Sequence, residues 1–450
     1  MRALLRRNLS RSSIALWRSR PSTNSSFLSS RTLAVPASFV DEEAEMVTFP
    51  REGLGISYEL NWKLNAKGVF VKDKAYHNLK VPELQKFGAC KPETLSGLPF
   101  YMRNNANGGA LDISMLQFSK LLKRVTSHLS SVSSIFVQDG AIGSSPKYDA
   151  KVRIISDNPS ALLPLSDIIW STSSQEISRG LCSLTAYVAS SISPKTVEDI
   201  GLESQSATAF SAGVIGDSSL IFCGNAFADI DFVKVALSTM AAPIISGKRG
   251  IPLCTRILVS GDSVILLFAH EDIAKNSPDL HAALVSPDIG AVLVPDGVTP
   301  FFRAKDPTMP NVLKEPSAVV FASSDSTGAL PSISKLSPEQ AAYHYLAGFH
   351  DGKFVPGYIN SPYLLDPLTV AKDFHERLKT KDTPSFLINV NDGGKFITGS
   401  DLLKLVKSSL SKDLTKSQPA ANDDKVNDLK EKYKSFLSGR FKELPEEFSF

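Results

Sequence analysis

The sequence is poor in the residue patterns that build metal and disulfide frameworks. Its 450 residues include four cysteines, and none of them pairs closely with another along the chain. The seven histidines are scattered, with no HxH or HExxH arrangement. No apolar run approaches the length of a membrane span. These absences argue against a zinc knuckle, a disulfide scaffold and a transmembrane segment, and they predict reduced cysteines in a globular core.

Acidic residues are missing from the first 40 positions, which hold seven arginines, many serines and no lysine. This composition is typical of an organelle transit peptide, and the arginine content favours a mitochondrion over a plastid. A disordered basic tail is the alternative. The whole chain has 49 basic residues. Without these seven arginines, 42 basic residues remain beside 46 acidic ones. The overall charge of +3 therefore does not describe the body of the chain, which is slightly acidic. This charge argues against a nucleic-acid-binding surface.

The length of the chain suffices for two or three domains, and its pattern predicts a mixed α/β protein with sheets covered on both faces. Helices are expected where apolar residues recur at helical spacing or a capping pattern opens a segment: 114–130, 158–170, 229–240 (ended by Pro243), 337–348, from 366, 401–410 and 422–441. Strands are expected at short apolar runs: 134–137, 150–155, 184–190, 220–223, 256–259, 264–268, 282–286, 291–294, 317–323 and 386–390. A loop containing Asp139 is expected between the first two strands.

The segment Gly261–Ser277 (GDSVILLFAHEDIAKNS) carries the main functional hypothesis. Its apolar block, Val264–Phe268 with Ala269, predicts a buried strand, and ligands of α/β domains bind at the carboxyl ends of such strands. The loop that follows contains His270, Glu271, Asp272 and Lys275. A phosphate-binding loop needs glycines, a lysine and a hydroxyl group, and this loop lacks the glycines.

Three segments resemble the ATP-dependent phosphoenolpyruvate carboxykinase family. Residues 76–84 (YHNLKVPEL) are similar to its opening motif, and residues 135–155 (IFVQDGAIGSSPKYDAKVRII) to its substrate-domain segment. Residues 318–349 (AVVFASSDSTGALPSISKLSPEQAAYHYLAGF) resemble its DxxGxLPPVSKL strand and the helix after it. The order is collinear from about residue 70 to the end.

The resemblance implies a fold of two lobes, each with a mixed sheet covered by helices. It also implies conversion of oxaloacetate and ATP to phosphoenolpyruvate, carbon dioxide and ADP, with Mg or Mn as the metal. The predicted organisation is a mitochondrial transit peptide at 1–40, a linker at 41–66, an N-terminal carboxykinase-like domain at 67–245, and a nucleotide-binding-like domain at 246–450 with a degraded phosphate loop.

The family's phosphate loop, GLSGTGKTT, aligns with residues 269–277 (AHEDIAKNS). Lys275 and Ser277 stand in register, so they are the vestigial nucleotide-binding candidates. Ala269, Asp272 and Ala274 replace the three glycines, and Glu271 replaces a serine. A carboxylate repels a phosphate charge by about 4 kcal/mol at about 4 Å and an effective dielectric of about 20.

The family's other functional positions are also altered. Of its paired aspartates only Asp288 remains, beside Ile289, which leaves Asp288 as a vestigial metal ligand. Its metal-binding histidine aligns with Thr255, and a threonine is a poor substitute for imidazole. The metal-binding lysine falls on Asp231 or Phe232, with Lys234 two to three residues along. No GRSP substrate motif is present, and Arg103 is the nearest basic residue.

These substitutions favour a pseudoenzyme: a mitochondrial matrix protein that binds an unidentified protein partner or belongs to a larger assembly, with no cofactor expected. The first alternative is an active ATP-dependent carboxykinase of gluconeogenesis, or an enzyme with altered chemistry that uses ATP and Mg or Mn. Its candidate residues would be Lys275, Ser277, Asp288, Glu271 and Asp272. Those acids could instead hold a cation without nucleotide, or form only a solvated loop. A nucleic-acid-associated protein is the third, weakest hypothesis.

Overall fold

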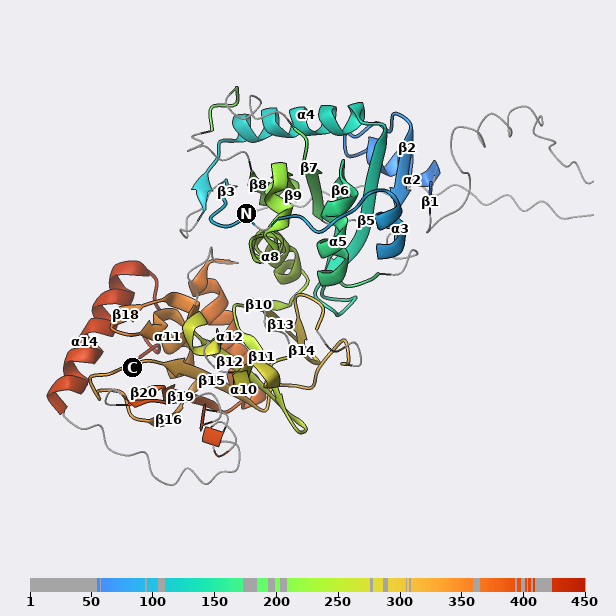
Figure 1. Ribbon diagram of the computed structural model, residues 1–450. Helices are drawn as coiled ribbons and strands as arrows, with labels where there is room; N and C mark the ends of the chain where they lie inside the picture. The colour runs from blue at the N-terminus through green and yellow to red at the C-terminus, as the bar shows by residue number, and fades with distance from the viewer. Residues whose placement is uncertain are drawn as a thin grey trace, which may run out of the picture. The chain divides into compact units, whose positions relative to one another are not determined.

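The computed structural model describes residues 55–449 except 57, 94, 104–109, 173–183, 193–198, 203–208, 276–277, 286–289, 305, 307–308, 359–364, 393–394, 398–400, 403, 406–407 and 409–422. The chain divides into a unit of residues 1–45 and a unit of residues 46–450, and everything described belongs to the second. The predicted transit peptide and most of the predicted linker therefore lie outside the described residues. The fold is mixed α/β with two main sheets, as the sequence predicts (Figure 1).

The first main sheet has nine strands and contains both parallel and antiparallel pairs. In spatial order its strands are β1 (Gly55–Ile56), β2 (Lys74–His77), β5 (Ser134–Ile142), β6 (Ala150–Ser156), β7 (Leu184–Ala189), β9 (Ser219–Cys223), β8 (Phe210–Val214), β3 (Phe100–Met102) and β4 (Leu111–Asp112). The helices of this lobe are α2 (Tyr58–Asn65), α3 (Val81–Lys86), α4 (Met115–Ser131), α5 (Pro159–Ile168) and α8 (Ile230–Gly247), with 3₁₀ turns η1 (Ile215–Asp217) and η2 (Gly224–Ala228).

Helices cover both faces of this sheet, because alternate strand residues supply two separate cores. Helix α4 lies along one face, and α5 and α8 lie on the other (Figure 1). Helix α4 begins where the sequence predicts, since the Ser114 hydroxyl accepts a hydrogen bond from the Gln117 backbone and the Gln117 side chain bonds back to the Ser114 backbone.

The second main sheet has five strands in the order β11 (Arg256–Ser260), β12 (Ser263–Ala269), β15 (Ala318–Ser323), β19 (Ser385–Asn389) and β16 (Ile333–Leu336). The pairs β12–β15 and β15–β19 are parallel, and the two outer pairs are antiparallel. Its helices are α9 (Glu271–Lys275), α10 (Pro278–Ala283), α11 (Pro338–Ala347), α12 (Pro367–Lys381) and α14 (Asp423–Arg440), with the 3₁₀ turn η3 (Pro356–Tyr358). There are also three small sheets among the described residues. One has three strands, β10 (Ile251–Leu253), β13 (Ala291–Val294) and β14 (Gly297–Pro300). The other two are the pairs β17 (Phe349–His350) with β18 (Lys353–Phe354) and β20 (Asn391–Asp392) with β21 (Lys395–Phe396).

Strand β12 confirms the predicted buried strand and explains why its sequence is apolar without interruption. Val264, Leu266 and Phe268 enter the core that contains residues of α11 and α12, and Phe268 stacks on Phe321 of β15 with ring centroids 5.0 Å apart. The residues between them enter the opposite core. A strand buried on both faces requires apolar side chains at every position.

Three local predictions are wrong. Strand β5 runs on to Ile142, so Asp139 lies within a strand and not in a loop. Helix α8 continues through Pro243 to Gly247, because burial of the last turn, including Ile245, offsets the hydrogen bond that proline cannot donate. Residues 278–283 form helix α10 where a strand was expected from residue 282, and Leu284 makes only an isolated bridge to Leu258.

Helix α8 is also the one described helix that is long and apolar enough to cross a membrane, which qualifies the expectation that no stretch approaches a span. Half of its 18-residue window is buried inside the protein. The helix packs against the nine-stranded sheet, so its apolar composition is explained by its place in the core.

Candidate functional site

The candidate site lies where two parallel strands of the second sheet end. Strand β12 ends at Ala269, His270 follows it, and helix α9 begins at Glu271. The neighbouring strand β15 is in register with β12, with Ala269 opposite Ala322. Just beyond β15, Ser324 forms a parallel bridge to His350. The chain path therefore brings His270 and His350, distant in sequence, to the same sheet edge, which is where α/β proteins bind ligands.

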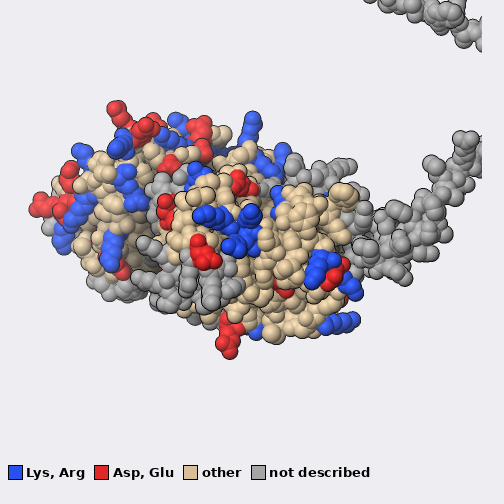
Figure 2. Space-filling view, turned by 90° about the horizontal axis from the view of Figure 1, so that it is seen from above, with Lys and Arg blue, Asp and Glu red and all other residues tan. Residues whose placement is uncertain are grey.

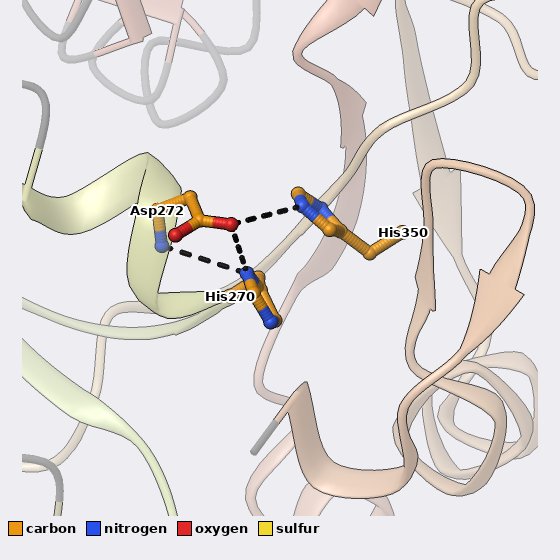
Figure 3. Close-up of side chains that lie close together, drawn as sticks. All are labelled: His270, Asp272 and His350. Atoms are coloured by element: carbon orange, nitrogen blue, oxygen red, sulfur yellow. Dashed lines mark hydrogen bonds and ion pairs between the residues drawn. The ribbon is translucent and has the colours of Figure 1, made fainter. Parts of the chain in front are cut away.

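His270, Asp272 and His350 converge at this edge (Figure 3). The imidazole rings of the two histidines stack, with centroids 4.2 Å apart and planes 20° apart. One carboxylate oxygen of Asp272, Oδ2, lies 3.1 Å from His270 Nδ1 and 4.0 Å from His350 Nε2. One potential ligand atom from each of the three residues falls within 4.8 Å of the other two. Two imidazoles and a carboxylate form a ligand set suited to divalent transition metals.

The two histidines are buried, whereas the Asp272 side chain is 70% exposed. Burial lowers the pKa of His350, and the neighbouring His270 lowers it further. The carboxylates of Asp351 and Asp272 act in the opposite direction without reversing the shift. The shift favours the neutral imidazole, which is the form that binds metals.

A second carboxylate borders the same histidine. Asp351 Oδ2 lies 3.7 Å from His350 Nε2. The other oxygen of Asp351 accepts a hydrogen bond from the Ser324 hydroxyl, and the Asp351 amide donates to the Ser324 carbonyl over 2.9 Å. These bonds fix the turn that follows His350 against the end of β15.

The nucleotide and metal candidates from the sequence fall only partly within the described residues. Lys275 is the last residue of α9, and its side chain lies outside the described part. Ser277 and Asp288 also lie outside the described residues. The prediction that these three form a vestigial nucleotide and metal site stays a prediction. Of the acids predicted beside them, Asp272 belongs to the cluster described above.

The other positions picked out by the resemblance lie on several elements of the fold. Thr255 is 1% exposed, and its hydroxyl donates to the Arg256 carbonyl over 3.4 Å, so it is a buried residue satisfied locally. Arg103 is exposed at the end of β3, and Lys234 lies half-buried on α8. None of these three residues belongs to the cluster of His270, Asp272 and His350.

Sequence reasoning missed His350 as a partner of His270. The two residues are far apart in the chain, so no ligand-spacing motif could reveal them. The position of His270 directly after a buried strand was a usable signal. His350 directly follows Phe349, the last residue of the segment that resembles the carboxykinase family.

Comparison with known proteins supports that resemblance. Residues 299–409 match the family model of phosphoenolpyruvate carboxykinase. Curated relatives named phosphoenolpyruvate carboxykinase (ATP) from Bacillus mycoides (strain KBAB4), Bacillus cereus (strain AH187) and Bacillus anthracis (strain A0248) are each 31% identical over 134 residues. The similarity to the ATP-dependent phosphoenolpyruvate carboxykinase family is thus supported over this segment of the chain. The alignment covers 26% of this chain and only a quarter of the length of each relative.

The segment matched by the carboxykinase family model contains β15, α11 and His350, but not β12 or α9. The residues that match the carboxykinase family model thus form elements next to the candidate site, including β15 and α11. The loop after β12, which determines what this edge of the sheet can bind, lies outside the matched residues.

Proposed function

We propose that this chain is a carboxykinase-fold protein that has lost the ATP-dependent carboxykinase reaction and acts as a binding or structural subunit in mitochondria. The observation that carries the proposal is the conformation of the loop after β12. It enters helix α9 directly, and two acids, Glu271 and Asp272, occupy the first turn of that helix.

Phosphate binding at such a loop depends on consecutive backbone amides that face the ligand, and glycines allow both the conformation and the close approach. Here Ala269 is the last residue of a buried strand, and the Asp272 amide is directed toward His270 Nδ1 at 3.5 Å. The carboxylates of Glu271 and Asp272 add negative charge where phosphate charge would accumulate. These features support loss of nucleotide binding.

The decisive experiment compares nucleotide binding and turnover with an active relative. The chain without residues 1–40 retains the entire compact unit from residue 46. We expect MgATP and MnATP to leave its melting temperature unchanged, and oxaloacetate-dependent formation of phosphoenolpyruvate to stay at the background rate. A Bacillus ATP-dependent carboxykinase, assayed in parallel, serves as the positive control. A saturable thermal shift with MgATP, or turnover above background, would contradict the proposal.

The face shown in Figure 2 lacks the charge pattern of a nucleic-acid-binding surface among its described residues. On the face shown in Figure 2, basic and acidic side chains are interspersed, and the described residues there form no continuous basic stripe. A nucleic acid needs an array of cationic contacts to its phosphates. We propose a protein partner, and native electrophoresis of mitochondrial extracts tests this. Migration with a larger assembly is expected, and migration as a free monomer would contradict the subunit role.

Mitochondrial location rests on the composition of residues 1–40. We expect isolated mitochondria to import the full chain and to remove an N-terminal segment of about this length. A variant in which the seven arginines become glutamines should fail to be imported, because the positive charge of a transit helix is lost. Equal import of both chains would contradict the proposed location.

A further inference from the structure

We propose that His270, Asp272 and His350 form a binding site for a divalent transition-metal cation with the ligand preferences of zinc. This inference goes beyond the proposed function and does not depend on it, because the cluster could hold a metal whether or not the chain retains an enzymatic activity. It departs from the expectation that the chain has no cofactor.

The spacing of the ligand atoms is close to what such a cation requires. Metal–ligand distances of about 2.0–2.2 Å in a tetrahedral zinc site place neighbouring ligand atoms about 3.4 Å apart. The distance between Asp272 Oδ2 and His270 Nδ1 is 3.1 Å, and that between Asp272 Oδ2 and His350 Nε2 is 4.0 Å. All three ligand atoms lie within 4.8 Å of one another.

His350 provides a second, independent reason to expect a ligand. Its side chain is about nine-tenths buried, and its Nε2 atom faces the carboxylates of Asp272 and Asp351 at 4.0 and 3.7 Å, beyond hydrogen-bonding distance. Its other ring nitrogen, Nδ1, is buried and has no hydrogen-bond partner among the described residues. The described residues thus hold this ring by no close hydrogen bond, and a cation bound at Nε2, between the two carboxylates, would give the buried ring a polar partner.

The ligand set selects the class of cation. Imidazole nitrogens favour zinc and neighbouring transition metals, whereas Mg²⁺ and Ca²⁺ prefer a shell of oxygen atoms. Three protein ligands leave at least one coordination position for water or for another ligand. Asp351, whose Oδ2 atom is 3.7 Å from His350 Nε2, is the nearest described carboxylate that could fill it.

The test uses the untagged full chain, freed of metal with a chelator and then titrated with ZnCl₂ in the absence of nucleotide. We expect one Zn²⁺ per chain by calorimetry and by elemental analysis, and a higher melting temperature with Zn²⁺ than without it. CoCl₂ should give visible absorption bands typical of nitrogen and oxygen coordination. Failure of the chelated chain to bind either ion stoichiometrically would reduce the cluster to a hydrogen-bonded network and overturn the proposal.

Asp272→Asn is the principal variant, because the Asp272 side chain is 70% exposed and its replacement leaves the core intact. We expect at least about tenfold weaker Zn²⁺ binding and loss of the thermal shift. His350→Gln should abolish the cobalt bands. His375→Gln is the matched control, since His375 is also buried in this lobe but pairs with Glu339, 3.2 Å away. Wild-type affinity in Asp272→Asn, or a loss in His375→Gln equal to that in Asp272→Asn, would overturn the assignment.

Discussion

Replacement of Asp139 should destabilise the nine-stranded sheet by about 3 kcal/mol. This carboxylate lies inside strand β5 and is 4% exposed. The guanidinium of Arg153, on the adjacent strand β6, donates to it through Nε and Nη2, both over 2.7 Å. His77 Nε2 lies 2.8 Å from Asp139 Oδ2. Removal of one member of a buried ion pair leaves the other charge uncompensated, at a cost of about 3–5 kcal/mol. An asparagine keeps one acceptor oxygen, so we expect the lower end of this range.

The titration of Asp139 supplies the pH dependence. Burial raises the pKa of this carboxyl, but the bonds from Arg153 and His77 outweigh burial and lower the pKa from 3.8 to about 2. A lowered pKa stabilises the native state fully above pH 3.8, and this contribution is lost as the pH falls through about 2. A shift of this size corresponds to about 2 kcal/mol. The stability difference between wild type and Asp139→Asn should thus shrink by about 2 kcal/mol as the pH falls from about 4 to about 2 and below.

Urea unfolding followed by far-ultraviolet circular dichroism measures both effects. Asp262→Asn is the control, because Asp262 is fully exposed and pairs with Lys314 over 3.4 Å. Exposed pairs contribute little, so the control should remain within about 0.5 kcal/mol of wild type. The reasoning would be refuted if the free energy of unfolding of Asp139→Asn fell no further than that of the control. It would also be refuted if the difference in this free energy from wild type were the same at pH 4 and pH 2.

Three further predictions concern local structure. Ser337→Ala removes the N-cap of α11 and should cost about 1 kcal/mol in urea unfolding, whereas an unchanged midpoint would refute the cap's role. Gly348→Ala should cost at least about 2 kcal/mol, because Gly348 has φ of 57° and a Cβ there would overlap the Val355 carbonyl oxygen; a loss below about 0.5 kcal/mol would refute this. Cys90 is exposed, whereas burial raises the pKa of the Cys223 thiol, so maleimide labelling with mass mapping should modify Cys90 in the native chain and Cys223 only after unfolding. Labelling of native Cys223 at the same rate would contradict its burial.

The fold was predictable where local chemistry and tertiary packing agree. Ser114 favours the start of a helix, and the uninterrupted apolar run of β12 favours a buried strand. The structure has both. The prediction failed at Pro243, where the local rule says that a helix ends. There the surrounding core continues the helix, because burial of Ile245 and its neighbours outweighs one missing hydrogen bond. Such a balance depends on residues distant in sequence, so a local pattern cannot reveal it.

The candidate site was less predictable, because it depends on the path of the chain. His270 could be placed at a strand end from its neighbours alone. Its stacking with His350 depends on the parallel register of β12 with β15, and on the bridge that joins Ser324 to His350. No pattern of spacing encodes either pairing, and a search for histidine motifs therefore finds nothing.

The loop after β12 now has a more definite chemical character than a phosphate loop without glycines. A cradle for phosphate presents backbone amides and a lysine, and thus attracts anions. This edge presents two buried imidazoles and the carboxylate of Asp272, with that of Asp351 beside His350, and these groups attract cations. In the alignment that the family resemblance implies, Asp272 takes the place of a glycine, and His350 lies in the segment that the family model matches. Loss of anion binding and gain of a cation site would therefore follow from one set of changes, and the nucleotide and zinc titrations test the two consequences separately.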